Sequence, residues 1–111
     1  MVKSLSVLRR KPGLTPEEFQ RYWKEKHGPL AARVVPGLRK YIQNHPVKIP
    51  GYEGDIDGIA EIWWDNIEGL QNFMAWRQTP ERKVLIEDEN KFIDKSRMER
   101  LLAVEHVVVG P

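Results

Sequence analysis

Two strong helix-start signals, each set between segments typical of β-strands, limit the folds that this chain can adopt. At the first signal, Thr15 is suited to the N-cap, Pro16 to the first helical position and Glu18 to the closing position of a capping box. At the second, Asn66 precedes an apolar-periodic segment and can cap it. The sequence therefore predicts one helical region that starts near Thr15 and another that starts near Asn66.

Four further segments have the composition of strands. In the first, Leu5 and Val7 alternate with Ser4 and Ser6, which is typical of a strand with one buried face. The predicted strands are residues 2–10, 36–46, 58–65 and 101–109, and the second helical region covers 67–77 and, after a Thr-Pro interruption, 81–94. Residues 47–57 are predicted to be a loop. The order is β-α-β-β-α-β, the ferredoxin-like α+β fold, in which helices cover one face of a four-stranded antiparallel sheet.

The other face of that sheet has no helix to cover it. Whichever face points outward, it carries Leu, Ile, Val or Trp side chains from the predicted strands. An apolar patch of this kind is an association site, so we expect a homodimer that packs sheet against sheet. At 111 residues the chain forms one domain, residues 1–111, without the length for a second core.

Composition excludes several classes of function. The 18 basic residues nearly balance the 16 acidic ones, and only residues 8–11 form a basic cluster, so we expect no nucleic-acid partner. The chain has no cysteine, which rules out thiol catalysis. No apolar run approaches the ~20 residues of a membrane span, and we expect a cytoplasmic protein with no membrane partner. The sequence also lacks a Gly-rich phosphate loop and the His and acidic spacings of metal sites, so no cofactor or metal is expected.

A histidine directly before Gly-Pro is the strongest candidate for chemistry. Pro29 has no amide hydrogen and disfavours helical geometry at Gly28, so the first helix is expected to end at about His27. The helix dipole favours a charged ring there by ~0.3–1 kcal/mol, whereas burial beside Trp23 opposes the charge. A ring under these opposing effects can act as a general acid or base. The alternative is that it only bonds to carbonyl groups at the helix end.

The helical pattern also places this histidine relative to the core. At ~100° per residue, Phe19, Trp23, Leu30 and Val34 share one face of the helix, and His27 lies at the edge of that face. We expect the break to turn the His27 ring toward the mouth between helix and sheet.

Several motifs together resemble the EthD-like family of the dimeric α+β barrel superfamily. They are "LRRKPGLTPEEFQRYWKEKHGPL", "VPGLRKYIQNH", "DGIAEIWWD", "DENKFIDKSR" and "VEHVVV". The resemblance implies the ferredoxin-like fold and a dimer, and it strengthens the case that His27 is functional. It leaves the reaction open, because the superfamily includes lactone isomerases, polyketide cyclases and decarboxylases, and cofactor-free oxygenases.

Asp57 and Glu61 are the expected catalytic partners of His27. They stand four residues apart, Asp57 directly at the start of the third predicted strand and Glu61 within it, and therefore share a face with Ile59 and Trp63. If that face is internal, a carboxylate there is desolvated and forms an acid–base pair with His27. If it is external, both carboxylates project into solvent.

Four side chains are expected to bind the substrate, namely Trp23, Tyr41, Asn44 and Trp63. Tyr41 and Asn44 would hydrogen-bond a carbonyl group as its enolate forms. Tyr41 shares one strand face with His45 while Asn44 takes the other, and the sequence does not decide which face lines the pocket.

These features favour a small cofactor-free enzyme that transfers protons, of isomerase, cyclase, decarboxylase or lyase type. Its substrate would be a hydrophobic aromatic or lactone-like small molecule, met in a degradation or polyketide-type pathway. Two alternatives stay open. One is a non-catalytic ligand-binding or accessory protein of a catabolic pathway, and the other is a haem-handling or cofactor-free monooxygenase relative.

Overall fold

The chain alternates strands and helices in the β-α-β-β-α-β order that the sequence predicts. A computed structural model describes residues 1–111. The elements are β1 (Val2–Leu8), α1 (Pro16–Tyr22), a π-helical segment η1 (Trp23–His27), α2 (Gly28–Val34), β2 (Lys40–Asn44), β3 (Gly58–Trp64), α3 (Ile67–Trp76), a 3₁₀ turn η2 (Pro80–Arg82), α4 (Lys83–Phe92), a 3₁₀ turn η3 (Lys95–Arg97) and β4 (Glu99–Ala103). The predicted loop, 47–57, has no regular element.

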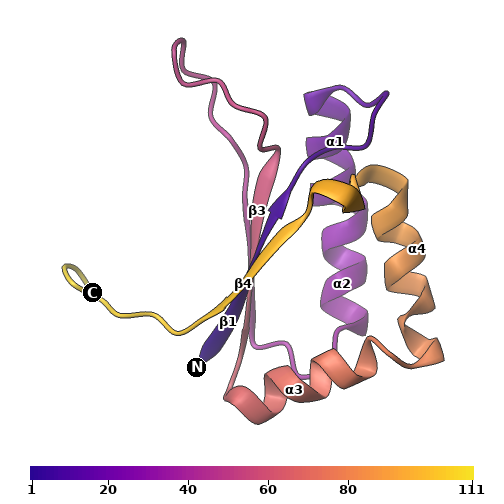
Figure 1. The fold of residues 1–111 in the computed structure, drawn as a ribbon, viewed down its shortest axis with the longest axis vertical. Helices are drawn as coiled ribbons and strands as arrows, with labels where there is room; N and C mark the ends of the chain where they lie inside the picture. The colour runs from indigo at the N-terminus through magenta and orange to yellow at the C-terminus, as the bar shows by residue number, and fades with distance from the viewer.

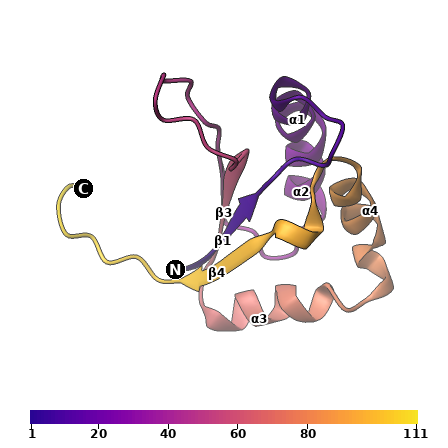
Figure 2. The ribbon, with the colours of Figure 1, turned by 45° about the horizontal axis from the view of Figure 1, so that its top comes forward.

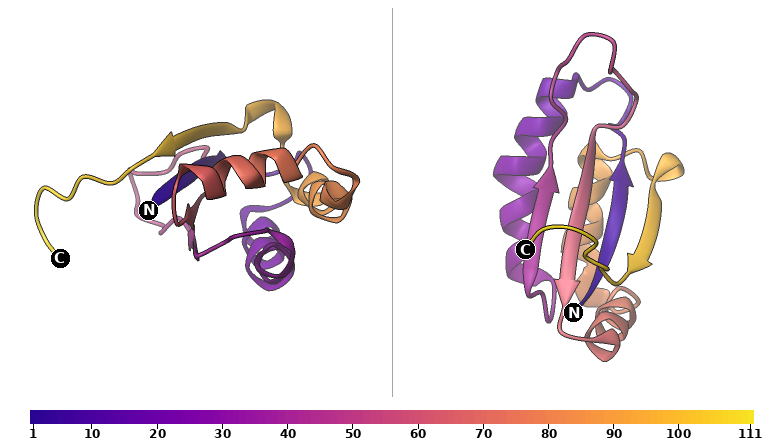
Figure 3. Two further views of the ribbon diagram at one scale, coloured as in Figure 1. Left: turned by 90° about the horizontal axis from the view of Figure 1, so that it is seen from below. Right: turned by 90° about the vertical axis from the view of Figure 1, so that its left-hand side faces the viewer.

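The four strands form one antiparallel sheet in the order β2-β3-β1-β4, which is the ferredoxin-like topology. Figure 1 views the sheet along its edge, with all the helices on one side. The long β2–β3 loop and the C-terminal tail extend away from the helices (Figure 2). In the face-on view of Figure 3 the uncovered side of the sheet is toward the reader. None of the helices combines the length and the apolar composition that crossing a bilayer requires.

Both predicted helix starts are confirmed. The Thr15 side chain accepts from the Glu18 backbone N–H at 3.1 Å, and the Glu18 carboxylate accepts from the Thr15 N–H at 2.9 Å. Asn66 Oδ1 accepts from the backbone N–H of Gly69 at 2.9 Å. These bonds satisfy amide groups that have no partner inside the helix, so each helix begins where its local sequence dictates.

The last strand differs from its prediction at both ends. Residues 101–109 were expected, whereas β4 runs from Glu99 to Ala103. Ala103 pairs with Lys3, and β1 itself begins at Val2, so beyond Val104 there is no residue of β1 left to pair with. The remaining tail, with Val104, is exposed.

β1 has its polar residues on the side that the helices cover. Its buried positions are Val2, Ser4, Ser6 and Leu8. Leu5 and Val7 lie on the uncovered face. The residues of the other strands on this face include Ile42, Ile59, Glu61, Trp63 and Leu101. β1 therefore places two serines in the middle of the space between sheet and helices, while its outward residues Leu5 and Val7 are apolar.

The helical backbone continues through Gly28, contrary to the expectation that the first helix ends at about His27. Gly28 has right-handed helical torsion angles, φ −56° and ψ −53°, and its N–H donates to the carbonyl of Trp23, five residues back. This bond makes a π turn, which contains one residue more than an α-helical turn. The wider turn accommodates Pro29, which has no N–H to donate.

The π turn also moves the buried face of the helix. Its buried side chains follow at intervals of four residues: Phe19, Trp23, His27, Ala31 and Val35. The expected stripe instead included Leu30 and Val34, which are only half-buried. An α-helix has ~3.6 residues per turn, so residues four apart gradually leave one face unless a wider turn restores them. The π turn restores the spacing, and His27 therefore lies at the centre of the buried face and not at its edge.

Two apolar clusters occupy the ends of the space between sheet and helices. Trp64 and Phe73 anchor one cluster, with ring centroids 4.9 Å apart. Trp23 anchors the other, packed against Phe19 at 5.8 Å. Trp23 also lies directly over Gly58, where an added Cβ would be 2.3 Å from its Cζ3 atom. The glycine is thus required for the helix to approach β3.

Gly58→Ala should lower the free energy of unfolding by about 1–3 kcal/mol, because the fully buried Trp23 ring cannot yield to the new methyl group. Gly54→Ala is the matched control, since nothing lies within 4 Å of an added Cβ there, and it should change stability by less than about 0.5 kcal/mol. Urea unfolding at one fixed protein concentration measures both. Equal stability of the two variants would contradict the close packing of Trp23 on β3.

Candidate functional site

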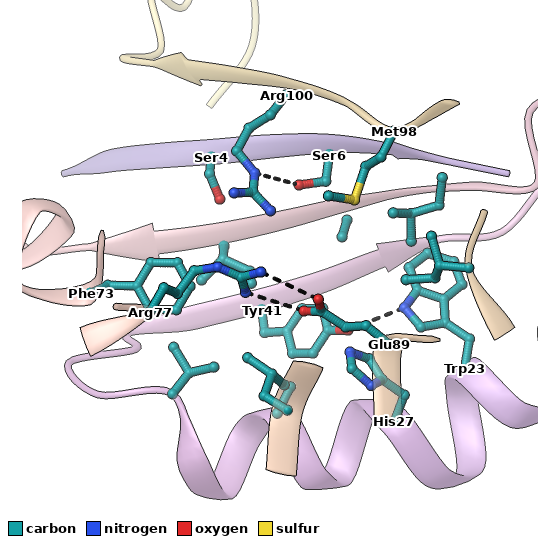
Figure 4. A pocket seen from close by; sticks show the side chains of 17 residues that line it. Ser4, Ser6, Trp23, His27, Tyr41, Phe73, Arg77, Glu89, Met98 and Arg100 are labelled. Atoms are coloured by element: carbon teal, nitrogen blue, oxygen red, sulfur yellow. Dashed lines mark hydrogen bonds and ion pairs between the residues drawn. The ribbon is translucent and has the colours of Figure 1, made fainter. Parts of the chain in front are cut away.

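A cavity of about 50 Å³ lies between the middle of the sheet and the helices (Figure 4). Eleven of its 17 lining residues are hydrophobic, and the other six are Ser4, Ser6, His27, Arg77, Glu89 and Arg100. A water molecule needs roughly 10–15 Å³, so the cavity holds a few water-sized groups and not a whole aromatic ring. Its open edge is beside β4, where Arg100 is exposed and Met98 is half-buried.

His27 lies in the wall of this cavity and is bonded to a carboxylate. The residue is 6% exposed, and its Nδ1 is 2.8 Å from Oδ2 of Asp88 on α4. Phe92 packs against the ring at a centroid distance of 4.9 Å. Nε2 has no protein hydrogen-bond partner and is not fully buried, since every fully buried side-chain nitrogen and oxygen has a partner. The ring belongs to the residues that line the cavity (Figure 4). The ring therefore does not bond to helix-end carbonyl groups.

Asp88 on α4 binds both His27 and Tyr22, and so links the first helical region to α4. The Tyr22 hydroxyl donates to Oδ1 of Asp88, and His27 bonds to Oδ2. Burial alone would raise the pKa of Asp88, but the bonds from Tyr22 and His27 outweigh it and the pKa is lowered. Burial and the Asp88 carboxylate raise the pKa of Tyr22 to about 12. Because Asp88 is thus an anion that can only accept, His27 Nδ1 is the donor in their bond, and in the neutral form of the ring the lone pair is on Nε2.

Tyr41 presents a free hydroxyl hydrogen at the same cavity. Its oxygen accepts from Trp23 Nε1 and from Gln43 Nε2, each at 3.2 Å. A hydroxyl oxygen has two acceptor positions, and both are occupied, so the Tyr41 hydrogen is left to donate elsewhere. Burial raises the pKa of Tyr41 despite these two donors. The side chain thus stays protonated.

The π turn is held in place from β2. Gln43 Nε2 donates to the carbonyl of Trp23 at 2.9 Å, the same carbonyl that accepts from Gly28. A Cβ on Gly28 would lie 2.6 Å from this Gln43 nitrogen. The Gly-Pro pair after His27 therefore serves two needs, since the glycine leaves room for Gln43 and the proline is tolerated by the wider turn.

Glu89 forms the second carboxylate of the site. Arg77 binds it through two contacts, of 3.2 Å to Oε2 and 3.3 Å to Oε1, and Lys95 also pairs with Oε1. Burial would raise the pKa of Glu89, but the bonds and charges of Arg77 and Lys95 outweigh it and lower the pKa. This carboxylate is ionised, and both of its oxygens are engaged (Figure 4).

The structure places Asp57 and Glu61 away from the cavity. Asp57, just before β3, is 5% exposed and binds the chain after β1 through Arg10, at 2.7 Å to the backbone N–H and 2.9 Å to Nη1. Glu61 lies on the uncovered face, 3.4 Å from Lys3 Nζ. Neither lines the cavity, so the prediction that one of them pairs with His27 is wrong. The reason is strand parity, because the helices cover the other face of β3.

Two of the four predicted substrate-binding residues line the cavity and two do not. Trp23 and Tyr41 are in its wall, where their contact with a substrate stays a prediction. Asn44 lies on the uncovered face and donates to the Ile59 carbonyl at 3.0 Å. Trp63 is on that face too, with Lys3 and Lys40 ammonium groups 5.0 Å and 4.8 Å from its ring centroid. For these two residues the predicted place in the pocket is wrong.

Sequence reasoning missed the acidic pair on α4. Asp88 and Glu89 stand three and four residues after Leu85, and Phe92 follows at seven, so all four share one helix face. Carboxylates within an apolar stripe are rarely buried unless paired. That spacing was the available signal. No group of three or more His, Asp or Glu side chains is arranged to hold a metal ion.

Comparison with known proteins identifies a family. Residues 11–96 match the EthD domain. No curated protein matches the chain.

Solved structures agree on the fold. An EthD family protein from Bacillus halodurans is 26% identical, with a TM-score of 0.70 over 96% of this chain and 100% of the other. A dimeric ferredoxin-like protein of unknown function from Thermobifida fusca is 10% identical, with a TM-score of 0.63 over 94% and 90%. SnoaB, a cofactor-independent oxygenase from Streptomyces nogalater, is 13% identical, with a TM-score of 0.63 over 99% and 97%.

Glu89→Gln should lower the free energy of unfolding at neutral pH by about 3 kcal/mol, because it leaves Arg77 without its buried carboxylate. The folded-state pKa of Glu89 lies below its ordinary value of 4.5, so its ionisation stabilises the fold above about pH 4.5. This contribution is lost as the pH falls through the lower folded-state pKa. Wild type should therefore lose stability on acidification more steeply than Glu89→Gln.

Urea unfolding across a pH series tests this difference. Glu87→Gln is the control on the same helix, since Glu87 is exposed and makes only a 3.8 Å surface pair with Lys83. It should change stability by less than about 0.5 kcal/mol and keep the wild-type pH dependence. Identical pH dependence in all three proteins would contradict the stabilising role of the Glu89 carboxylate.

Proposed function

Since the chain belongs to the EthD family, we propose that it is a cofactor-independent enzyme that transfers a proton at a carbon next to a carbonyl group. The reaction would be of isomerase, cyclase, decarboxylase or lyase type, on a small, largely hydrophobic substrate. One observation carries the proposal: the His27 ring lines the cavity with its Nε2 unpaired while Asp88 holds its Nδ1. An imidazole oriented by a carboxylate in this way is suited to general base catalysis.

The mechanism uses two side chains of the cavity wall. Nε2 of the neutral His27 ring takes a proton from the substrate carbon, and the carbon–hydrogen electron pair moves into an enolate. The Asp88 carboxylate faces the imidazolium that forms. The Tyr41 hydroxyl, whose oxygen already accepts two hydrogen bonds, donates to the enolate oxygen. Return of the proton to another carbon completes an isomerisation and regenerates the neutral ring.

Cavity size limits which part of a substrate lies inside. The space of about 50 Å³ accommodates a carbonyl group and the carbon beside it. A larger ring enters only if Arg100 and Met98, at the open edge, move aside. Cofactor independence is supported by analogy with the fold alone, since SnoaB of the same architecture is a cofactor-independent oxygenase.

A homodimer that packs sheet against sheet is part of the proposal. The uncovered face carries an apolar side chain from every strand: Leu5, Val7, Ile42, Ile59 and Leu101. Leu101 is 59% exposed in the single chain. Such a patch favours association, and the Thermobifida fusca protein of the same fold is dimeric.

Hydrogen–deuterium exchange at carbon tests the catalytic proposal, and it does so whatever product the reaction forms. Aromatic lactones, anthrones and polyketide-like ketones are incubated with the protein in D₂O, and NMR follows loss of the proton beside the carbonyl. We expect wild type to accelerate exchange of at least one compound and His27→Gln to lose about 10²-fold or more of that rate. Tyr41→Phe should lose a similar factor, because the enolate oxygen lacks its donor.

His106→Gln is the matched control for this experiment. His106 lies in the exposed tail and is not part of the cavity, so its replacement should leave the exchange rate unchanged. A His27→Gln variant that exchanges the carbon-bound proton at the wild-type rate would refute the role of His27. A higher melting temperature of His27→Phe, with no compound turned over by wild type, would favour the non-catalytic binding protein.

Leu5→Lys should convert a dimer to a monomer, since it places a charge at the centre of the uncovered face. Light scattering coupled to size exclusion should give twice the chain mass for wild type and one chain mass for the variant. Val84→Lys, which changes a 46% exposed apolar residue on α4, should stay dimeric. A monomeric wild type, or a dimeric Leu5→Lys, would contradict this packing.

A further inference from the structure

The cavity has more cationic groups than anionic ones. Arg77 and Lys95 share the single carboxylate of Glu89. Arg100, from β4, has no carboxylate within 4.0 Å, and its hydrogen bond is from Nε to the Ser6 hydroxyl at 3.3 Å. Figure 4 shows the Arg100 and Arg77 side chains extending toward the cavity from opposite sides, one from the sheet and one from the helices. The guanidinium of Arg100 therefore has no anionic partner at the cavity.

The position of Arg100 is unfavourable for an unpaired charge. Although the residue as a whole is exposed, loss of solvent around its guanidinium lowers the pKa of Arg100, and the nearby charge of Arg77 lowers it further, with only partial relief from Glu89. A guanidinium nevertheless stays protonated in proteins. Two like charges that face one small cavity are stabilised when an anion lies between them.

The uncommitted polar atoms of the cavity are mostly donors. Ser4 is 5% exposed, lines the cavity, and has a hydroxyl with no protein partner. Because every fully buried side-chain oxygen has a partner, this hydroxyl is not fully buried and opens on the cavity. Ser6 accepts from Arg100 and keeps its own hydrogen. Tyr41 likewise has a hydrogen to donate. The serine hydroxyls can also accept, and Nε2 of a neutral His27 ring is an acceptor, whereas the guanidinium of Arg100 can only donate.

We propose that the substrate carries a carboxylate, bound by the guanidinium of Arg100 and the hydroxyls of Ser4 and Ser6. A carboxylate supplies only acceptors, and its planar pair of oxygens matches the guanidinium fork. Three heavy atoms fit the space of about 50 Å³. The carboxylate lies at the β4 side of the cavity, with the remaining space on the side of His27 left to the reacting carbon. The reaction assigned to that carbon rests on the proposed function, whereas the binding site does not.

Titration with matched acid and amide pairs tests the site. Acetate is compared with acetamide, and propionate with propionamide, each pair having nearly the same shape and differing in charge. NMR of the protein follows binding, with the Trp23 indole N–H as a reporter in the cavity wall. We expect wild type to bind the acid of at least one pair about tenfold more tightly than its amide. In Arg100→Gln this preference should disappear, and in Arg100→Lys it should be partly retained.

Arg39→Gln is the control for loss of a positive charge. Arg39 pairs with Asp65 at the surface, where the side chain is 60% exposed, and is not part of the cavity. Arg39→Gln should still bind the acid more tightly than its amide. Amides that bind as tightly as acids, a preference that persists in Arg100→Gln, or no binding of either acid would each overturn the proposal. Inorganic phosphate that binds as tightly as the better acid would also overturn it, since the site would then recognise phosphate.

His27→Gln separates this inference from the proposed function. The variant should keep the preference for acids, because His27 is not one of the binding donors, and should lose carbon exchange. Acid binding without exchange by wild type would refute the reaction alone. Exchange of neutral ketones by wild type, with no preference for acids in the titration, would refute the carboxylate site alone.

Discussion

The ring of Pro29 is the constraint on which the site depends. In an α-helical turn this ring would clash with the carbonyl four residues back, and the chain instead widens by one residue into a π turn closed by the Gly28 N–H on the Trp23 carbonyl. The extra residue brings His27 to the centre of the buried face. It thereby comes within 2.8 Å of Asp88, and its other nitrogen is left for the cavity. π turns of this kind often mark functional sites.

Buried carboxylates in so small a domain are tolerated because each of them is paired. Asp88 receives hydrogen bonds from two other helical segments, and Glu89 binds Arg77 and Lys95. No fully buried side-chain nitrogen or oxygen is without a partner. Removing one member of such a network is costly, because the remaining group stays buried and unpaired. The same bonds hold the donor and acceptor atoms at fixed positions, which pre-organises the cavity for a ligand.

Features set by local chemistry were predictable from the sequence, and features set by distant contacts were not. Capping at Thr15 and Asn66 depends on neighbours within three residues, so the helix starts and the order of elements followed directly. Strand alternation has the same period on both faces, and the sequence offered no means to know which face the helices cover. Strand spacing alone therefore allows Asp57 and Glu61 to lie beside His27. The actual partner, Asp88, comes from a helix 61 residues away along the chain.

The seven residues of β1 must meet two opposing demands. Ser4 and Ser6 face the helices, whereas Leu5 and Val7 face outward, the reverse of what a solitary domain would gain from burying its apolar groups. Exchanging the serines for valine would strengthen the protomer and fill the space needed for a ligand. Exchanging the leucine and valine for polar residues would improve solubility and remove the surface through which two copies could meet. Adaptation of this strand is thus a trade-off, in which robustness, assembly and recognition cannot all be improved together.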